Sequence, residues 1–325
     1  MKNFLNAVRC NKLMTALAAF LFIAVILSAA ANIFVANNKI TATIQHFQAM
    51  DSLPDGQGQK VKVILLNGQS NASGVGSVQY LQEKSSSEDF ARYEAGYDNI
   101  LINFFSENGN YSSSGHFVKA KVGQGCTPDY IGPELGLADT LSQTYNDELV
   151  FILKYTWGGS NLHTQWRAPS MTGATGELYI AFINFTSTCM DYLRLKNYDA
   201  EISTMCWMQG ESDAYLPYAN EYEEGLKNFL EDLRSDLNQY ISEDGLHFID
   251  AGIYDSPLVD QYQLINNAKQ NVTALSPKNH YFDTIEEGLE YDQEPLGNPD
   301  LAHFDSISAL RLGHLFANVI VDVLS

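Results

Sequence analysis

The sequence predicts an α/β fold, a three-layer α/β/α sandwich in which helices cover both faces of a mainly parallel, five-stranded sheet. From residue 61 onward, short apolar runs alternate with longer segments whose apolar residues recur at helical spacing. Such alternation is typical of a parallel sheet, because the chain must cross back before the next parallel strand can begin. The 325 residues, 45% of them hydrophobic, are enough for one large domain, and no internal repeat is visible.

Five apolar runs are the expected strands, and five amphipathic segments are the expected helices. The strands are 61–66, 149–155, 202–207, 247–252 and 280–283. The helices are 132–145, 178–196, 218–241, 258–271 and 306–324. Residues 80–125 show weak periodicity and many Ser, Gly, Asn and Tyr residues. We interpret them as a long excursion over the edge of the sheet where a ligand binds.

The first 40 residues differ from the rest of the chain. Lys2, Arg9 and Lys12 precede an uncharged apolar run over residues 13–36. This run exceeds the ~20 residues that a membrane span needs, and the basic residues before it place the amino terminus in the cytoplasm. A cleaved signal peptide ending near Ala29–Ala31 is the alternative. Both interpretations put the rest of the protein outside the cytoplasm, either membrane-anchored or secreted.

The remaining chain divides into a linker and one domain. Residues 41–60 are polar and contain Pro54, Gly56 and Gly58, which predicts a linker, and residues 61–325 form the domain. Its three cysteines exclude a full disulfide framework but leave a single Cys126–Cys189 bridge open. No Cys/His cluster has the spacing of zinc ligands, so we expect neither a metal nor an organic cofactor.

The charge of the chain excludes one class of partner. Its formal net charge is −20, and four of its 19 basic residues but none of its 39 acidic ones lie in the first 40. Residues 41–325 therefore carry 15 basic against 39 acidic residues, or −24. Such a surface repels nucleic acid and anionic lipid, and suits solubility outside the cell and a neutral or cationic substrate.

The first strand leads into Gly68-Gln69-Ser70-Asn71. A buried strand that ends in Gly-x-Ser places a hydroxyl at the carboxyl edge of a parallel sheet, where α/β proteins bind ligands. Serine becomes a strong nucleophile when a base takes its proton, so a base is expected nearby. The structural alternative is that Ser70 only caps the helix that follows.

Two later strands also end in residues suited to catalysis. Gly158-Gly159 follows strand 149–155, and paired glycines let backbone amides approach a ligand, as in an oxyanion hole. Gln209-Gly210-Glu211 follows strand 202–207. Gln209 supplies a side-chain amide donor, whereas Glu211 is an acid placed just beyond a buried strand. Capping of the following helix is the alternative role for this segment.

The segment Asp300-Leu301-Ala302-His303 offers the base. A carboxylate three residues before an imidazole can hold one ring nitrogen while the other accepts the serine proton. His163, after the glycine turn, could line the pocket and compete for this role. His314 lies within the apolar pattern of the last helix and is expected to be a packing or surface residue.

These segments, in this order, resemble the SGNH hydrolase superfamily, which has a flavodoxin-like fold. More narrowly, they are similar to its sialate O-acetylesterase and acetylxylan esterase branch, carbohydrate esterase family 6. That branch has Gly-Gln-Ser-Asn and Gln-Gly-Glu, which stand here at Gly68–Asn71 and Gln209–Glu211. Gly132-Pro133-Glu134, the Gly158-Gly159 pair followed by Trp166, and Asp300-x-x-His303 also fit. Ser160–His163 depart from the usual pattern by adding a histidine.

The resemblance implies roles for individual residues. Ser70 would be the nucleophile, His303 the general base and Asp300 the orienting acid, with Glu211 as an alternative acid or a residue behind the catalytic groups. The oxyanion hole would consist of the Ser70 and Gly159 amides and the Gln209 side chain. Asn71 would fix the nucleophile loop.

The sequence therefore predicts an extracytoplasmic serine esterase. It would remove O-acetyl groups from sialic acid, xylan or a similar glycan through an acetyl-enzyme intermediate. Two alternatives stay open, namely a lipase or thioesterase of the same superfamily and a non-catalytic surface protein that binds carbohydrate. The first would favour longer acyl chains, and the second would bind sugar without releasing acetate.

Overall fold

A computed structural model describes residues 47–106 and 111–325, so the expected membrane anchor or signal peptide lies outside the described residues. The central sheet has eight strands in the order β10-β9-β8-β1-β7-β3-β4, with β5 also pairing with β3. Its strands are β1 (Lys60–Gly68), β3 (Tyr97–Ser106), β4 (Tyr111–Ser112), β5 (Val118–Ala120), β7 (Val150–Thr156), β8 (Asp199–Met208), β9 (His247–Ala251) and β10 (Asn279–Phe282). Strands β2 (Gly76–Ser77) and β6 (Tyr130–Ile131) form a separate antiparallel pair.

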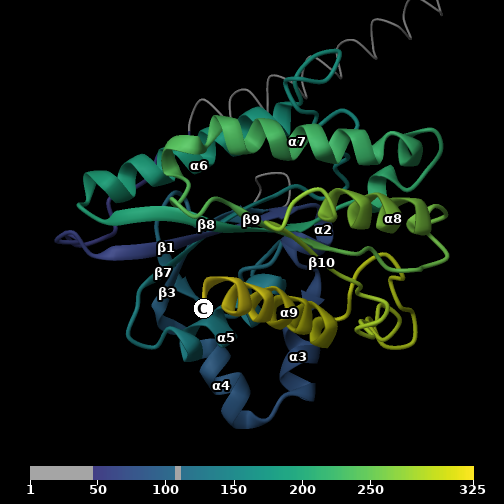
Figure 1. Ribbon diagram of the computed structural model, residues 1–325. Helices are drawn as coiled ribbons and strands as arrows, with labels where there is room; N and C mark the ends of the chain where they lie inside the picture. Colours follow the sequence, from purple (N-terminus) through teal and green to yellow (C-terminus); the bar gives the residue numbers. More distant parts are fainter. Residues whose placement is uncertain (1–46, 107–110) are drawn as a thin grey trace, which may run out of the picture. The chain divides into compact units, whose positions relative to one another are not determined.

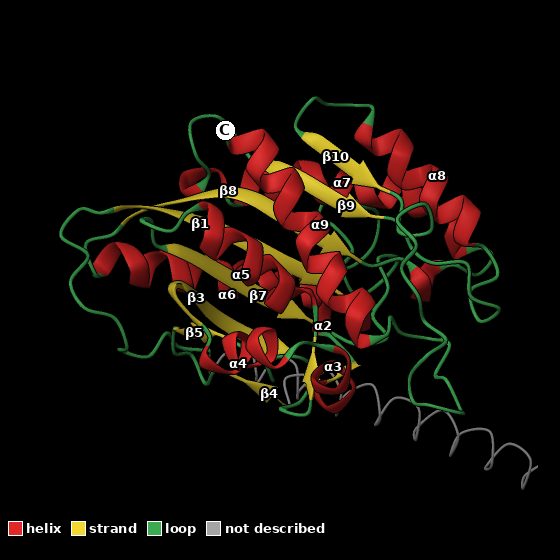
Figure 2. Cartoon of the chain, turned by 90° about the horizontal axis from the view of Figure 1, so that it is seen from below, coloured by secondary structure: helices red, strands yellow, loops and turns green. Residues whose placement is uncertain are grey.

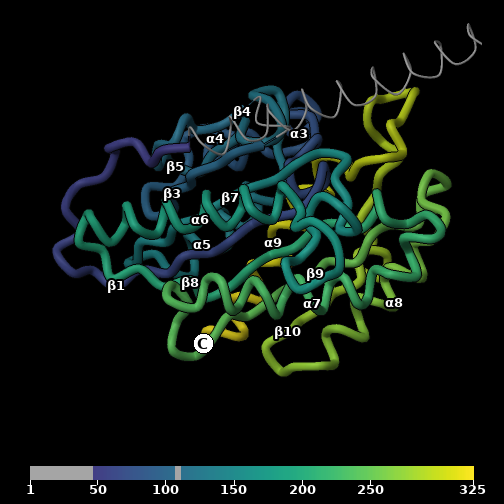
Figure 3. Tube along the Cα trace, turned by 90° about the horizontal axis from the view of Figure 1, so that it is seen from above, coloured from purple at the N-terminus to yellow at the C-terminus, as the bar shows by residue number. Residues whose placement is uncertain are grey.

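Helices pack on both faces of the sheet, which confirms the three-layer α/β/α prediction. Figure 1 shows α6, α7 and α8 on one face and α5 and α9 on the other, with α3 and α4 beyond them. Figure 2, from below, shows α9 beside α5, and Figure 3, from above, shows α6 and α7 crossing the sheet. The helices are α2 (Ser70–Ser73), α3 (Val78–Lys84), α4 (Ser87–Ala95), α5 (Pro133–Thr144), α6 (Glu177–Leu195), α7 (Tyr222–Asp236), α8 (Tyr262–Thr273) and α9 (Ser306–Leu324).

The sheet is wider than the sequence predicts. All five expected strands are present, but the excursion expected over 80–125 contains most of α3 and all of α4, β3, β4 and β5. Strand β3 runs parallel to β7 and is the sixth strand of the parallel part. Polar residues interrupt the apolar pattern that would identify β3 as a buried strand. One of them, Asn103, is fully buried and donates to the Gly115 carbonyl over 3.0 Å. A buried amide with a tertiary partner costs little, but single-sequence periodicity does not reveal the partner.

The predicted linker and the open disulfide also need correction. Within the described part of 41–60, Leu53 is buried, and the Ser52 and Leu53 amides donate to the Tyr192 hydroxyl over 2.9 and 3.1 Å. Residues 47–59 therefore belong to the domain, because their backbone is held by α6. Cys189, fully buried on α6, is a free thiol, so no bridge joins it to Cys126.

Helix α9 packs closely against α5. Among the described residues, α9 is the one helix long and apolar enough to cross a membrane by length and composition. Its buried face, which includes Leu312, Phe316 and Ile320, faces the domain, as expected of a core helix. At Gly313 the helices approach so closely that a Cβ would lie 2.1 Å from the Pro133 carbonyl oxygen. Glycine is therefore required there by contact between two backbones.

Replacing this glycine tests the packing. Gly313→Ala should destabilise the protein by about 1–3 kcal/mol despite the better helix propensity of alanine, because α9 must shift away from α5. The matched control is Gly225→Ala on α7, where the nearest side-chain atom would lie 3.4 Å from the new Cβ. It should be neutral or stabilising by up to about 1 kcal/mol. Urea unfolding followed by circular dichroism measures both, and equal effects would contradict the contact.

Candidate active site

The three strand ends that carry the predicted motifs lie side by side. Gly68 at the end of β1 pairs in register with Thr156 of β7 and with Met208 of β8. The loop after β1 is hydrogen-bonded to both neighbours: Gln69 N donates to Met208 O over 3.0 Å, and Trp157 N donates to Gly68 O over 3.1 Å. The three segments therefore form one surface at the carboxyl edge of the sheet, as the strand order predicts.

The turn before the nucleophile requires glycine. Gly68 has φ +140°, and a Cβ there would lie 1.9 Å from the Met208 carbonyl oxygen. This turn leads directly into α2, whose first residue is Ser70. Ser70 is 9% exposed, and its amide lies in the first turn, where backbone N–H groups have no partner within the helix. Hydroxyl and amide are thus placed together, as a nucleophile and oxyanion donor need to be.

His303 and Asp300 are paired as predicted. His303 Nδ1 lies 2.7 Å from Asp300 Oδ2, and Asp300 Oδ1 accepts from the Ala302 amide over 2.9 Å. Two hydroxyl groups bind the backbone between Asp300 and His303: Ser256 donates to Leu301 O, and Tyr254 donates to Ala302 O. With Nδ1 engaged by the carboxylate, Nε2 is the nitrogen left to take a proton.

Asn71 joins the nucleophile loop to the histidine loop. Its Oδ1 accepts from the Phe304 amide over 3.0 Å, and its Nδ2 donates to Glu211 Oε1 over 2.6 Å. Asn71 follows Ser70 and Phe304 follows His303, so this bond joins the two loops that carry the catalytic candidates. Among the described residues no hydrogen bond joins Ser70 to His303, and such bonds often tighten only when substrate is bound.

Glu211 lies behind the site instead of holding the imidazole. It is buried, burial raises the pKa of its carboxyl, and the Asn71 amide and the charges of Lys269 and His303 oppose that rise. Its Oε1 accepts from Asn71, whereas His303 is hydrogen-bonded to Asp300. Of the two acids that the sequence left open, Asp300 therefore has the geometry of the orienting residue.

The Gln209 side chain is used within the protein. It is fully buried, and its Nε2 lies 2.6 Å from Asp213 Oδ2, 3.2 Å from Ser160 O and 3.3 Å from Gln69 Oε1. The two N–H groups of the Gln209 amide already face three acceptors, so a substrate oxyanion would have to displace one of these acceptors. This arrangement favours a positioning role for Gln209 over the predicted donor role. The amide of Gly159, in an exposed turn at φ +66°, stays a predicted donor.

A buried ion pair that sequence reasoning missed lies under the nucleophile helix. Lys154 of β7 is fully buried, and its Nζ contacts Glu134 Oε2, Ser73 O and Gln124 O at 2.7, 2.7 and 2.8 Å. Burial lowers the pKa of Lys154, and Glu134 opposes that shift. Ser73 O is at the end of α2, so Lys154 anchors the helix that carries Ser70. The sequence feature that could have revealed this ion pair is the single lysine inside an otherwise apolar strand.

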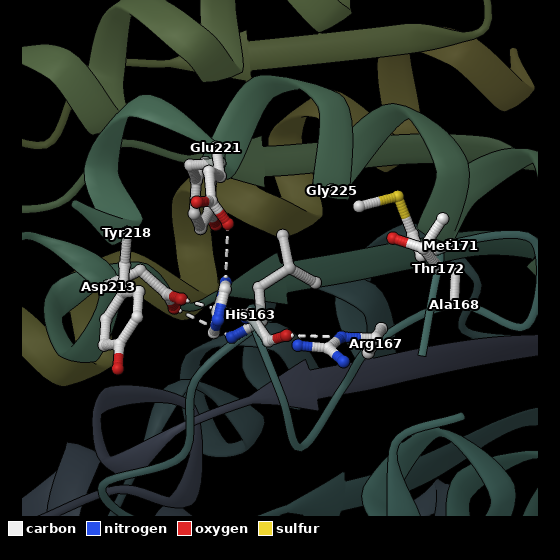
Figure 4. Close-up of a pocket in the computed structure, with 11 residues that line it drawn as sticks. His163, Arg167, Ala168, Met171, Thr172, Asp213, Tyr218, Glu221 and Gly225 are labelled. Carbon is white, nitrogen blue, oxygen red and sulfur yellow. Dashed lines mark hydrogen bonds and ion pairs between the residues drawn. The ribbon is translucent and has the colours of Figure 1, made fainter. Parts of the chain in front are cut away.

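The two competing histidines have other partners. His163 lines a separate cavity of about 110 Å³, where its Nδ1 pairs with Glu221 over 2.8 Å and its ring stacks on Tyr218 (Figure 4). His314 lies between helices, with Nδ1 2.8 Å from Thr140 Oγ1. By contrast, His303 and Asp300 line a cleft of about 740 Å³ that shares no lining residue with the cavity of His163.

Comparison with family models identifies the class of protein. Residues 60–322 match the family described as "Carbohydrate esterase, sialic acid-specific acetylesterase". The match spans most of the chain, so this protein belongs to that family and is a carboxylic ester hydrolase, a carbohydrate O-acetylesterase. The resemblance to the sialate O-acetylesterase and acetylxylan esterase branch is thereby confirmed. Among curated proteins, no sequence matches this chain.

Solved structures support the same fold. A protein from Arabidopsis thaliana has a TM-score of 0.58 at 18% identity, covering 83% of this chain and 99% of its own. NanS has a TM-score of 0.57 at 16% identity, covering 84% and 99%. A carbohydrate acetylesterase from Xanthomonas citri has a TM-score of 0.52 at 16% identity, covering 78% and 55%. At these identities the likeness concerns the fold.

The buried ion pair is testable by a double-variant cycle. Lys154→Met should destabilise the protein by about 3–5 kcal/mol, because Glu134 is left buried without its cation. Adding Glu134→Gln should recover part of that loss, since the buried charge is removed while the Gly132 amide keeps an acceptor. Urea unfolding measures both variants. A cost below about 1 kcal/mol for Lys154→Met alone would contradict the role assigned to the pair.

The orienting acid can be identified by two matched amide substitutions. Asp300→Asn should lower kcat by about 10²–10⁴-fold, because an amide neither fixes the right tautomer nor stabilises the imidazolium. Glu211→Gln keeps an oxygen that accepts from Asn71 and removes only the charge, so its effect should stay below about tenfold. Turnover of 4-nitrophenyl acetate measures both. The reverse pattern would make Glu211 the orienting acid.

Proposed function

We propose that this protein is an extracytoplasmic serine esterase that removes O-acetyl groups from a carbohydrate through an acetyl-enzyme intermediate. The observation that carries the proposal is the Asn71 hydrogen bond, which joins the loop of Ser70 to the loop of the His303–Asp300 pair. A nucleophile, a base and an acid that orients the base are the minimum set for acyl transfer by serine. The acetylesterase description printed for the Xanthomonas citri neighbour is consistent with this chemistry.

The proposed reaction has two halves. Ser70 Oγ attacks the acetyl carbonyl while His303 Nε2 takes its proton, and the backbone amides of Ser70 and Gly159 stabilise the oxyanion. When the tetrahedral intermediate collapses, the bond to the sugar oxygen breaks and His303 protonates that oxygen. Water, deprotonated by His303, then attacks the acetyl-enzyme and releases acetate and free Ser70.

The extracytoplasmic location rests on the amino-terminal sequence. Residues 13–36 are uncharged and apolar, and the basic residues that precede them favour a cytoplasmic amino terminus. The formal charge of −24 over residues 41–325 suits a soluble domain outside the cell. Protease added to intact cells of the producing host would digest a surface-anchored domain and leave a cytoplasmic one intact.

Acetate release by the full-length protein tests the proposed activity. Wild-type protein should release acetate from acetylated xylan or O-acetylated sialic acid, and Ser70→Ala should lower kcat by at least about 10³-fold without unfolding. Ser73→Ala is a matched control, because it removes a partnerless hydroxyl from the same helix and keeps the carbonyl bound by Lys154.

Three outcomes separate the alternatives. Acetate release that Ser70→Ala abolishes supports the esterase. Turnover that rises with acyl chain length beyond acetate would favour a lipase or thioesterase. Sugar binding without hydrolysis of any ester, including 4-nitrophenyl acetate, would overturn the enzymatic proposal in favour of a carbohydrate-binding protein.

A further inference from the structure

A cleft lies beside the proposed catalytic histidine. It has a volume of about 740 Å³, and both His303 and Asp300 line it. Its walls come from α3 with the residues before it, from Asp129 and Tyr130, and from the segment 294–305. This volume falls within the range typical of small-molecule sites and is ample for a sugar unit.

The chemistry of the proposed reaction places the departing sugar in this cleft. In acyl transfer the general base returns its proton to the leaving oxygen, so the leaving group lies on the histidine side of the nucleophile. In an acetylated carbohydrate that leaving group is the sugar. His303 lines the cleft, so a sugar that leaves on that side would lie in it.

The uncharged part of the lining suits a sugar ring. Tyr80 and Tyr130 are half-buried, and Pro295 and Leu296 add apolar surface, with Leu296 90% exposed. Sugars present apolar C–H faces that pack on aromatic and aliphatic groups. The side chains of Gln79 and Gln82 add amide donors and acceptors for ring hydroxyls.

The Asp and Glu side chains in the lining all carry negative charge. Among the described residues, no lysine or arginine lines the cleft. Its five carboxylates are those of Glu83, Asp129, Glu294, Asp300 and Asp305. Glu294 and Asp305 accept backbone amides, and Asp300 holds His303. Glu83 and Asp129 are exposed, and neither forms an ion pair among the described residues. Their charges therefore act on whatever enters the cleft.

No lysine or arginine from the described part of the chain belongs to the lining of the cleft. Lys84 Nζ lies 5.2 Å from the centre of the Tyr80 ring, but Lys84 is not part of the lining. Lys154 is buried against Glu134. Arg167 lines the smaller cavity beside His163, which shares no residue with the cleft (Figure 4). A substrate carboxylate in the cleft would thus meet like charges without an arginine or lysine to pair with.

We infer that the cleft binds the leaving sugar as an uncharged glycosyl unit, and that Glu83 and Asp129 disfavour sugars that carry a carboxylate. The inference rests on the proposed esterase function and adds a substrate class to it. It separates neutral acetylated glycans from acetylated sugar acids, although the family description names sialic acid, which is a sugar acid.

A matched pair of substrates tests the inference on the full-length protein. Methyl glucoside and methyl glucuronoside, acetylated to the same degree, differ by one carboxylate. At about 20 mM salt, kcat/KM for the glucoside should exceed that for the glucuronoside by about tenfold, from like charges acting across a wet cleft. At 0.5 M NaCl the ratio should fall toward one, because screening then acts within a few ångströms.

Charge variants assign the effect to named residues. The double variant Glu83→Gln/Asp129→Asn should lower the glucoside-to-glucuronoside ratio by about fivefold at low salt. The matched control is Glu231→Gln, which removes a charge from exposed α7 on the opposite face of the sheet and should leave the ratio unchanged (Figure 1). An equal fall in the control would mean that net charge, and not the cleft, sets the preference, which would overturn the inference.

The remaining outcomes distinguish this inference from the proposed function. Equal or faster turnover of the glucuronoside by the wild type overturns the inference and leaves the esterase intact. Hydrolysis of 4-nitrophenyl acetate, sensitive to Ser70→Ala, without turnover of either sugar ester also overturns the inference alone. Failure to hydrolyse 4-nitrophenyl acetate as well overturns the proposed function, and the substrate class with it.

Discussion

The hydrogen bonds of one buried asparagine define the site. Asn71 faces a backbone amide of the histidine loop and the carboxylate of Glu211, so it connects segments that lie 233 and 140 residues away in the sequence. Hydrogen bonds to charged groups contribute about 1.5–3 kcal/mol each, and a buried amide without partners is costly. If the histidine loop moved away, Asn71 Oδ1 and the Phe304 amide would lose this hydrogen bond. The catalytic geometry is thus tied to the stability of the fold.

The other end of the nucleophile helix is held by a second buried interaction. Helix α2 has four residues, too few to be stable alone. Gly68 places its start against β8, and Lys154 binds the Ser73 carbonyl at its end. A lysine inside the sheet costs desolvation, which Glu134 and two carbonyls offset. Rigid elements on both sides therefore position Ser70, which is what precise acyl transfer requires.

The sequence predicted the parallel sheet and the Asp300–His303 pair because both follow from local pattern. Strand ends converge at one edge in any parallel sheet, and three-residue spacing suffices for a carboxylate to reach an imidazole. What it missed depends on tertiary partners. Strand β3 buries Asn103 against the carbonyl of Gly115, outside the strand, and Lys154 contacts Glu134 of another element. The Gln209 amide faces Ser160 O and Gln69 Oε1 from two other loops. The same limit applies to residues 47–59, which Tyr192 holds against the domain.

The acidity of the cleft follows from how its walls are built. The irregular segment 294–305 has no regular structure to satisfy its backbone, so Glu294 and Asp305 supply acceptors for amides at its ends. Asp300 must be an acid to orient His303. Three of the five carboxylates are therefore fixed by structure and chemistry, whatever the substrate, and a cation would be needed beside them to admit a sugar acid. Glu83 of α3 and Asp129 before β6 add negative charge in its place, so the cleft beside the base restricts the class of sugar that can leave from it.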